Sequence, residues 1–494
     1  MIIVGLFFLA GTAFAQQSAI QYWRPYDQRG INVFETSKND TVVFEGLKVR
    51  FGAGFTQGYQ SIEHSNSARA TFGTYLETAP GSGVFTLANG NPLPVGTTIA
   101  KNPAVAGGYA VTQGANTTQF ADVNSFYAMA GGFPLAQANL NIDVQLADGI
   151  SLNLVSYMSS HHHNEFWVKG GYLKIDKVSF LNSALFDRLW KNLTLKVGHM
   201  EVNYGDAHFR RSDGGHTIWN PWVENNIMDE FTTEIGAELY WKKNGVIAML
   251  GFTDGEIKGD VSDPSAPDGA KRKPSLYGKL GFDKQVTDNF RARLTGSFYT
   301  TKSSTSNTIF GGDRTGSNYQ YVMENGPVKL TDNAFSGRFN PGFKDNVTTI
   351  MINPFVKLSG LEVFGTLEWA SGNSQFENGE GVTGYSAEGD RDASQIAAEA
   401  LYRFGKNEKF YVGARYITVS ATIAEGYTAT VQGTRYDVDI NRTSIGAGWF
   451  ITRNILLKGE YVTQKYEGFK DTGANNRFYG GEFDGIVIQG AISF

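Results

Sequence analysis

The chain has 494 residues, no cysteine and a formal net charge of -5 at pH 7. The absence of cysteine excludes structural disulfides, thiolate catalysis and cysteine-ligated metal sites, and the negative charge argues against a general nucleic-acid-binding protein. With 59 glycines, 35 phenylalanines and 23 tyrosines, the composition favours a strand-forming protein whose apolar residues are dispersed along the chain.

The first fifteen residues, MIIVGLFFLAGTAFA, form an apolar run that ends in small residues at Ala13 and Ala15. This pattern is typical of a secretory signal peptide and predicts cleavage before Gln16. Residues 16–45 are then expected to form a periplasmic N-terminal segment, and 46–494 a membrane domain. After the signal, no window approaches the roughly 20 consecutive apolar residues that a spanning helix requires, so an embedded chain would have to cross as strands.

Segments of alternating apolar and polar residues follow in series, each ended by a turn. The first covers 46–57, and the second begins at ANLNIDVQL near residue 138. Between them, the stretch of about 62–135 is predicted to be a long first outer loop that could cap the mouth, fold inward or mediate contact between protomers. The other predicted strands are 151–160, 165–178, 192–204, 230–242, 246–257, 274–285, 289–302, 347–358, 361–371, 393–404, 409–421, 435–452, 454–466 and 481–494.

Long and short connections alternate along this series. The pattern predicts an all-β fold, a transmembrane up-and-down antiparallel β-barrel of about 16 strands with long extracellular loops and short periplasmic turns. Closure is required because an open sheet edge finds no hydrogen-bond partner in hydrocarbon. A barrel of about 16 strands is wide enough for an aqueous lumen. The last segment, GIVIQGAISF, is apolar on one face and ends at Phe494, which is predicted to be the assembly signal of a closing strand.

Sorting each strand by side assigns its polar face to the lumen. Cations outnumber anions on that face, which favours a mild preference for anions. Paired charges that only keep the wall hydrated are an equally good interpretation. The predicted lumen residues are the cations Lys48, Arg50, Lys169, Lys196, Lys279, Arg291, Arg293, Lys357, Arg403, Arg415 and Lys458, and the anions Asp143, Glu234, Glu238, Glu368, Glu399 and Glu460.

Three segments, KVGHMEVNYGDAHFRRSD (196–213), RPYDQRGINVFET (24–36) and HHHNEFWVKGGYLKID (161–176), resemble outer-membrane porins of the Bacteroidota type. The KVG…YG strand is more distantly similar to the phosphate-selective porin family, which implies a sixteen-stranded trimeric channel with an arginine-bearing constriction. No full arginine ladder or lysine cluster can be matched, and Glu201 and Glu238 stand among the cations. Strict phosphate specificity is therefore in doubt.

The same resemblance implies that the third outer loop, 205–229, folds into the barrel and forms the constriction. Two adjacent arginines in this loop could hold an oxyanion through bidentate hydrogen bonds, and two tryptophans could stack on a sugar. A salt bridge within the loop is the alternative interpretation of the arginines. The candidate constriction residues are Arg210, Arg211, Asp206, Asp213, Trp219 and Trp222.

The expected function is that of a porin in the bacterial outer membrane, a water-filled channel for passive diffusion of small anionic or neutral solutes. Neither a cofactor nor a metal is expected, and the G-x-S-x-G and H-E-x-x-H motifs of hydrolases are absent from the sequence. The expected partners are outer-membrane lipids and lipopolysaccharide, the barrel assembly machinery and two further copies in a homotrimer. The main alternative is a structural or secretion-complex barrel whose loops occlude the lumen.

Overall fold

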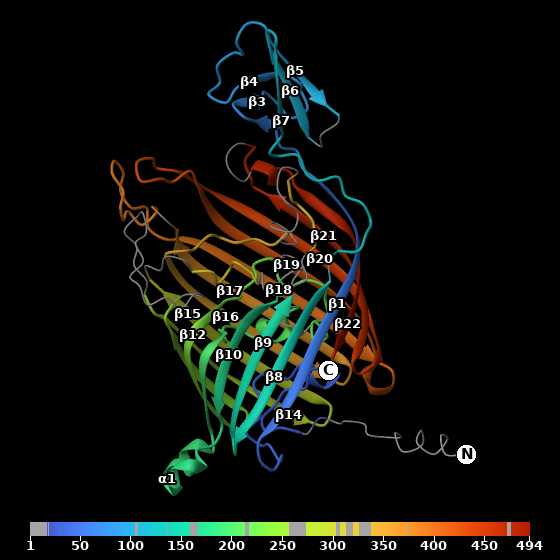
Figure 1. Ribbon diagram of the computed structural model, residues 1–494, viewed down its shortest axis with the longest axis vertical. Coiled ribbons are helices and arrows are strands. Elements are labelled where there is room, and N and C mark those ends of the chain that lie inside the picture. Colours follow the sequence, from blue (N-terminus) through green and yellow to red (C-terminus); the bar gives the residue numbers. More distant parts are fainter. Residues whose placement is uncertain are drawn as a thin grey trace, which may run out of the picture.

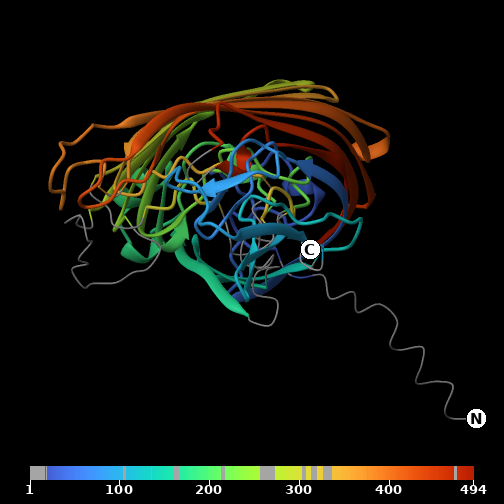
Figure 2. The same ribbon diagram turned by 90° about the horizontal axis from the view of Figure 1, so that it is seen from above.

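Sixteen strands form one closed antiparallel barrel within the residues that the computed structural model describes (Figures 1 and 2). No helix in this described part is both long and apolar enough to cross a membrane. The predicted signal peptide, the histidines 161–163 and Asp213 lie outside the described residues. The described residues are 17, 19–103, 107–134, 136–158, 166–212, 217–255, 273–302, 307–312, 320–325, 337–374, 376–471 and 476–494.

Each barrel strand pairs with its neighbours in the chain, as an up-and-down meander requires, so the predicted all-β sixteen-strand fold is confirmed. The strands are β1 (Lys48–Ser65), β8 (Gln137–Ala147), β9 (Ile150–Met158), β10 (Trp167–Ile175), β11 (Leu193–Glu201), β12 (Thr233–Lys243), β13 (Val246–Thr253), β14 (Ser275–Thr287), β15 (Phe290–Thr301), β16 (Asn346–Leu358), β17 (Leu361–Asn373), β18 (Arg391–Phe404), β19 (Phe410–Glu425), β20 (Thr434–Thr452), β21 (Ile455–Glu467) and β22 (Glu482–Ser493).

The barrel closes where the first strand pairs with the last. The ladder between β1 and β22 runs from Gly54 opposite Ser493 to Ser65 opposite Glu482. Ala53 and Phe494 extend it, since each backbone N–H donates to the other's carbonyl oxygen at 3.0 Å. The sequence predicted that β1 ends at residue 57. It extends to Ser65 because β22 pairs with it up to that residue.

The outer face of the barrel carries a belt of exposed apolar side chains, among them Leu250, Leu280, Ile350, Ile445 and Ile486. Exposed aromatic side chains lie near strand ends, as membrane-interface girdles require. Such a belt is stable only against hydrocarbon. The protein is therefore a transmembrane β-barrel of a bacterial outer membrane. The exposed girdle residues include Phe51, Trp241, Trp369, Phe404 and Trp449.

The first outer loop folds into a separate small unit at the extracellular end of the barrel (Figure 1). Phe72 stacks on Tyr109 with ring centroids 4.3 Å apart, in an aromatic cluster that includes Phe85. The sequence predicted this segment only as a loop. It contains two three-stranded sheets, one of β2 (Thr71–Phe72), β3 (Tyr75–Glu77) and β4 (Phe85–Leu87), and one of β5 (Thr97–Asn102), β6 (Gly108–Gln113) and β7 (Asn116–Ala121).

Short helices lie in several connections. The connection between β10 and β11 holds η2 (Ser179–Leu181) and α1 (Ala184–Trp190). The others are η1 (Gln28–Gly30), η3 (Ala207–Arg210), η4 (Lys406–Glu408) and η5 (Asn476–Phe478).

The N-terminal segment packs against the inner wall at the periplasmic half of the barrel. The Gln21 N–H donates to Gln145 Oε1 at 2.7 Å, and the Tyr26 hydroxyl donates to Asp143 Oδ2 at 2.9 Å. Phe34 is buried against Phe355 of β16. The sequence predicted that the whole of 16–45 lies in the periplasm. Residues 20–36 instead lie inside the barrel, because their aromatic side chains bury apolar surface there.

Candidate functional site

The third outer loop lies inside the ring of strands. Tyr204, Val223, Ile227 and Met228 are buried and belong to one apolar cluster with inward-facing wall residues. The wall side of that cluster includes Met351 of β16, Ile417 of β19, Ile440 of β20 and Val462 of β21. The centre of the barrel is therefore filled by side chains along the β14–β22 wall.

Asp206 anchors this loop to the wall. Its carboxylate accepts hydrogen bonds from Lys279 Nζ at 2.9 Å, from Arg293 Nε and Nη2 at 2.8 Å each, and from Thr295 Oγ1 at 2.7 Å. The Asp206 N–H donates to Asn353 Oδ1 at 2.8 Å. All of the charged side chains in this group are fully buried, so they hold the loop in place and do not face solvent.

The two candidate arginines are both engaged with carboxylates. Arg210 pairs with Glu399 of β18, and Arg211 pairs with Asp229 near the end of the loop. The pair of Arg211 with Asp229 is a salt bridge within the loop, as the alternative interpretation expects, whereas Arg210 pairs with a wall residue. Glu399 is remote in the sequence, so spacing gave no signal for that pair.

The two candidate tryptophans pack within the plug that the loop forms with the N-terminal segment. The Arg24 guanidinium lies 3.4 Å from the ring centroid of Trp219, whose Nε1 donates to the Asp27 carbonyl at 3.1 Å. A Cβ on Gly30 would lie 2.4 Å from the same Nε1, so only glycine allows this approach. Trp222 donates its indole N–H to Glu399. Both indoles are buried and offer no open face to a sugar.

The predicted lumen residues occupy two environments on the inner side of the wall. One group is buried against the loop, the N-terminal segment or neighbouring strands, and the other keeps partial access to solvent. Alternation could assign a face to each residue, but it could not show what would cover that face. The buried group contains Lys279, Arg293, Arg403, Arg415, Lys458, Asp143, Glu234, Glu238, Glu368 and Glu460, and the partly accessible group contains Lys48, Arg50, Lys169, Lys196, Arg291, Lys357 and Glu399.

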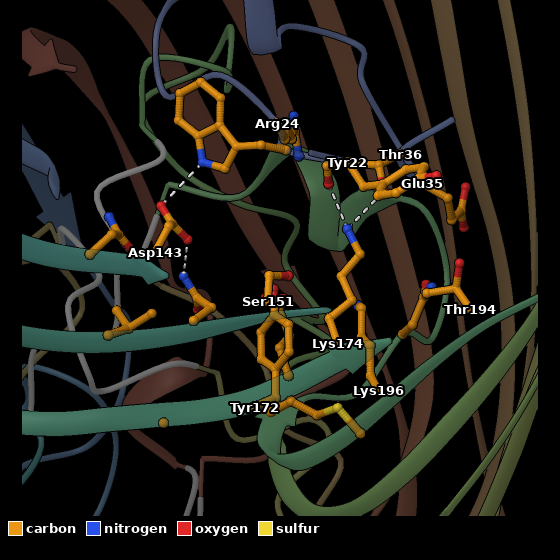
Figure 3. A pocket seen from close by; sticks show the side chains of 18 of the residues that line it. Tyr22, Arg24, Glu35, Thr36, Asp143, Ser151, Tyr172, Lys174, Thr194 and Lys196 are labelled. Atoms are coloured by element: carbon orange, nitrogen blue, oxygen red, sulfur yellow. Dashed lines mark hydrogen bonds between the residues drawn. The ribbon is translucent and has the colours of Figure 1, made fainter. Parts of the chain in front are cut away.

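A cavity of about 260 Å³ follows the β8–β12 wall, between the wall and the plug (Figure 3). Its lining includes Lys169 and Lys174 near opposite ends of β10, and Thr233 and Lys242 at opposite ends of β12. The N-terminal segment supplies the facing side through Tyr22, Trp23, Arg24, Glu35 and Thr36. The cavity therefore extends over most of the height of this wall.

Cationic side chains outnumber anionic ones in the lining of this cavity, and three of the cations, Lys174, Lys196 and Arg211, are paired with carboxylates outside the lining. Lys196 Nζ donates to the Tyr240 hydroxyl at 3.1 Å, and its side chain is one quarter exposed. Lys174 Nζ donates to the Tyr22 carbonyl at 2.5 Å and to Thr36 Oγ1 at 3.3 Å (Figure 3). The cationic lining residues are Arg24, Lys169, Lys174, Lys196, Arg211 and Lys242, and the anionic ones are Glu35, Asp143 and Glu201.

Two further cavities share lining residues with this one and with each other. A mouth cavity of about 600 Å³ lies among the outer loops and is lined by Asp229 and Arg338. A small cavity of about 30 Å³ shares Asp229 with the mouth cavity and is also lined by Arg211. Arg211 in turn lines the cavity along β8–β12. Arg211 and Arg338 both pair with Asp229, so this three-residue cluster contributes to the lining of all three cavities.

The sequence did not predict that the N-terminal segment contributes to the site. Trp23, Tyr26 and Phe34 stand close together there, and this aromatic density was the available signal for a packed segment. Asp229 and Arg338 gave no comparable signal. Among the described residues, no group of three or more His, Asp or Glu side chains is arranged to hold a metal ion.

No protein-family model and no curated protein matches the chain. Several solved outer-membrane structures are similar over most of its length. An anion-selective porin from Comamonas acidovorans is 9% identical, with 91% of this chain and 100% of that chain covered and a TM-score of 0.45. The outer membrane channel DcaP of Acinetobacter baumannii is 11% identical (92% and 99% covered, TM-score 0.45), and OpdL of Pseudomonas aeruginosa is 9% identical (90% and 98% covered, TM-score 0.39). These values are too low to assign an activity.

Proposed function

We propose that the protein is an outer-membrane porin in which small solutes pass along the β8–β12 wall and not through the centre of the barrel. The observation that carries this proposal is the series of three cavities that share lining residues, from the mouth cavity through Asp229 and Arg211 to the cavity along β8–β12. The plug fills the centre, and the inner cavity is space along the β8–β12 wall that the described side chains leave open.

We further propose a mild preference for anions. Six cationic and three anionic side chains line the inner cavity, and a positive lining lowers the electrostatic barrier to an anion in a narrow bore. The ion-paired cluster at Asp229 is the narrowest point of the proposed route. Small inorganic and organic anions are therefore the proposed solutes, and neutral solutes of similar size would also pass.

The test is the conductance of the purified protein in planar bilayers, with the reversal potential measured across a potassium chloride gradient. Charge removal by Lys196→Gln should shift the reversal potential toward cation preference, because Lys196 lines the inner cavity. Lys357→Gln is the matched control. Its side chain is also inward-facing and 27% exposed, against 25% for Lys196, but it lies outside the three cavities. Equal effects of the two variants would contradict the proposed route.

A second candidate function is a structural barrel without conductance, and the filled centre favours it. The Arg211–Asp229–Arg338 cluster could close the remaining route completely. In that case the purified protein would show no channel activity in bilayers, and it would remain bound to partner proteins when extracted from membranes. Conductance steps from the unmodified protein would rule this candidate out.

A further inference from the structure

The periplasmic connection between β10 and β11 exposes an unusual concentration of large apolar side chains. Leu185 of α1 is 65% exposed, as much as Leu280 in the lipid-facing belt of the barrel. Four more large apolar side chains of the same connection are exposed: Phe180, Leu181, Phe186 and Leu189. A cluster of this kind in water would promote aggregation of a monomeric protein. It therefore indicates a surface that is covered by another apolar surface.

The helix α1 separates its apolar and polar residues into two faces. With about 3.6 residues per turn, Leu185, Phe186, Leu189 and Trp190 fall on one side. Asp187, Arg188 and Lys191 fall on the other side, and all three are exposed. An amphipathic helix with basic residues on its polar face is typical of a segment that lies in a lipid interface.

The position of this connection matches such a role. In Figure 1, α1 lies beyond the periplasmic ends of the barrel strands, at the bottom of the view. Leu193, which follows it, pairs with Trp241, an exposed aromatic residue of the periplasmic girdle. Two contacts fix the connection at this level: Trp190 Nε1 donates to the Ile175 carbonyl at 3.3 Å, and Lys177 Nζ pairs with Asp148 at 2.8 Å.

We propose that η2 and α1 form an interfacial anchor that lies in the periplasmic leaflet of the outer membrane. The apolar face continues the lipid-facing belt of the barrel, and the basic residues Arg188 and Lys191 face anionic phospholipid headgroups. An apolar surface that adjoins the periplasmic girdle and carries Arg188 and Lys191 on its polar side fits a phospholipid leaflet better than it fits a water-exposed protein partner. The anchor would fix the tilt and depth of the β8–β12 wall, beside which the inner cavity runs.

The absence of cysteine allows a direct test. Leu185→Cys and Asp187→Cys each accept one environment-sensitive fluorophore, on opposite faces of the same helix. The labelled proteins are reconstituted in vesicles of phosphatidylcholine and phosphatidylglycerol, with and without a lipid that carries a nitroxide quencher high on its acyl chain. Leu280→Cys is the control for a residue in the lipid belt, and Val95→Cys is the control for a residue in water, since Val95 is fully exposed in the extracellular unit.

The expected result is that the nitroxide lipid quenches the label at Leu185 to nearly the same extent as the label at Leu280. The label at Asp187 should keep most of its fluorescence. A label at Leu185 that behaves like the label at Val95 would show that the helix stands in water and would overturn the proposal. Protection of Leu185 from a water-soluble quencher without quenching by the nitroxide lipid would overturn it too, because that pattern requires a second copy of the chain as the cover. Every labelled position is exposed, and a heat-dependent shift in gel mobility confirms that each variant is folded.

Discussion

Single residues inside the barrel form buried ion pairs, and Asp206 pairs with both Lys279 and Arg293. We expect Asp206→Asn to lower the free energy of unfolding by about 3–5 kcal/mol, because removing one partner leaves the buried Lys279 and Arg293 without their carboxylate. Denaturant titration followed by gel mobility measures the change. Asp288→Asn, in the exposed turn between β14 and β15, is the control and should have little effect. A similar loss in both variants would contradict the anchoring role of Asp206.

Because of Glu35, we expect the binding of the N-terminal segment inside the barrel to depend on pH. Burial disfavours its charged form, but the charges of Arg293 and Lys279 outweigh burial and lower the pKa of Glu35 from 4.5 to about 2. A carboxyl group whose pKa is lowered in the folded state adds to the free energy of unfolding above pH 4.5. This contribution is lost as the pH falls toward 2.

Bilayer recordings at stepwise lower pH can detect this loss. Conductance should rise in that acid range, because release of residues 20–36 enlarges the space beside the β8–β12 wall. Glu35→Gln should show a raised conductance already at neutral pH, with a weaker pH dependence. A rise of the same size and midpoint in both proteins would show that Glu35 is not the responsible group.

Among the elements, the extracellular unit of the first outer loop contributes its own core and is joined to the barrel at closely spaced ends. Asn66 Nδ2 donates to the Asn124 carbonyl at 2.8 Å, so a short linker can replace the intervening residues. We expect replacement of 68–122 by a few glycine and serine residues to leave barrel folding unchanged, because the ladders of β1 with β8 and β22 lie below this unit. Loss of the folded gel mobility would contradict this expectation. Deletion of 205–229 is the contrasting variant and should prevent folding.

The strands were predictable because their signal is local. Side chains alternate between two faces, so Lys196, Lys279 and Arg293 could be assigned to the inner side from neighbouring residues alone. The contents of the barrel depend on contacts between distant segments, such as Glu35 with Arg293 or Trp222 with Glu399. No local pattern encodes those pairs. The helix α1 was missed because a segment of seven residues is too short for a reliable periodic signal.

For the molecule as a whole, the proposed solute route passes the cluster of Arg211, Asp229 and Arg338. We expect Asp229→Asn to leave two arginines without their shared carboxylate, so that phosphate binds there and blocks chloride current at lower concentration than in the unmodified protein. Asp283→Asn is a matched control, since Asp283 also pairs with two arginines, Arg291 and Arg293, but lies outside the three cavities.

Single-channel recordings with added phosphate measure this block. Equal sensitivity in the two variants would place the narrowest point elsewhere. No effect in either would indicate that anions do not enter the mouth cavity.

The pairing of β1 with β22 makes closure depend on the last strand. A chain that lacks β22 leaves two strands, β1 and β21, each with an unpaired edge. The backbone groups of those edges need other hydrogen-bond partners until β22 pairs with β1. A nascent chain that stops before residue 482 would present the β1 edge to other polypeptides, and such truncated products are expected to aggregate and not to insert.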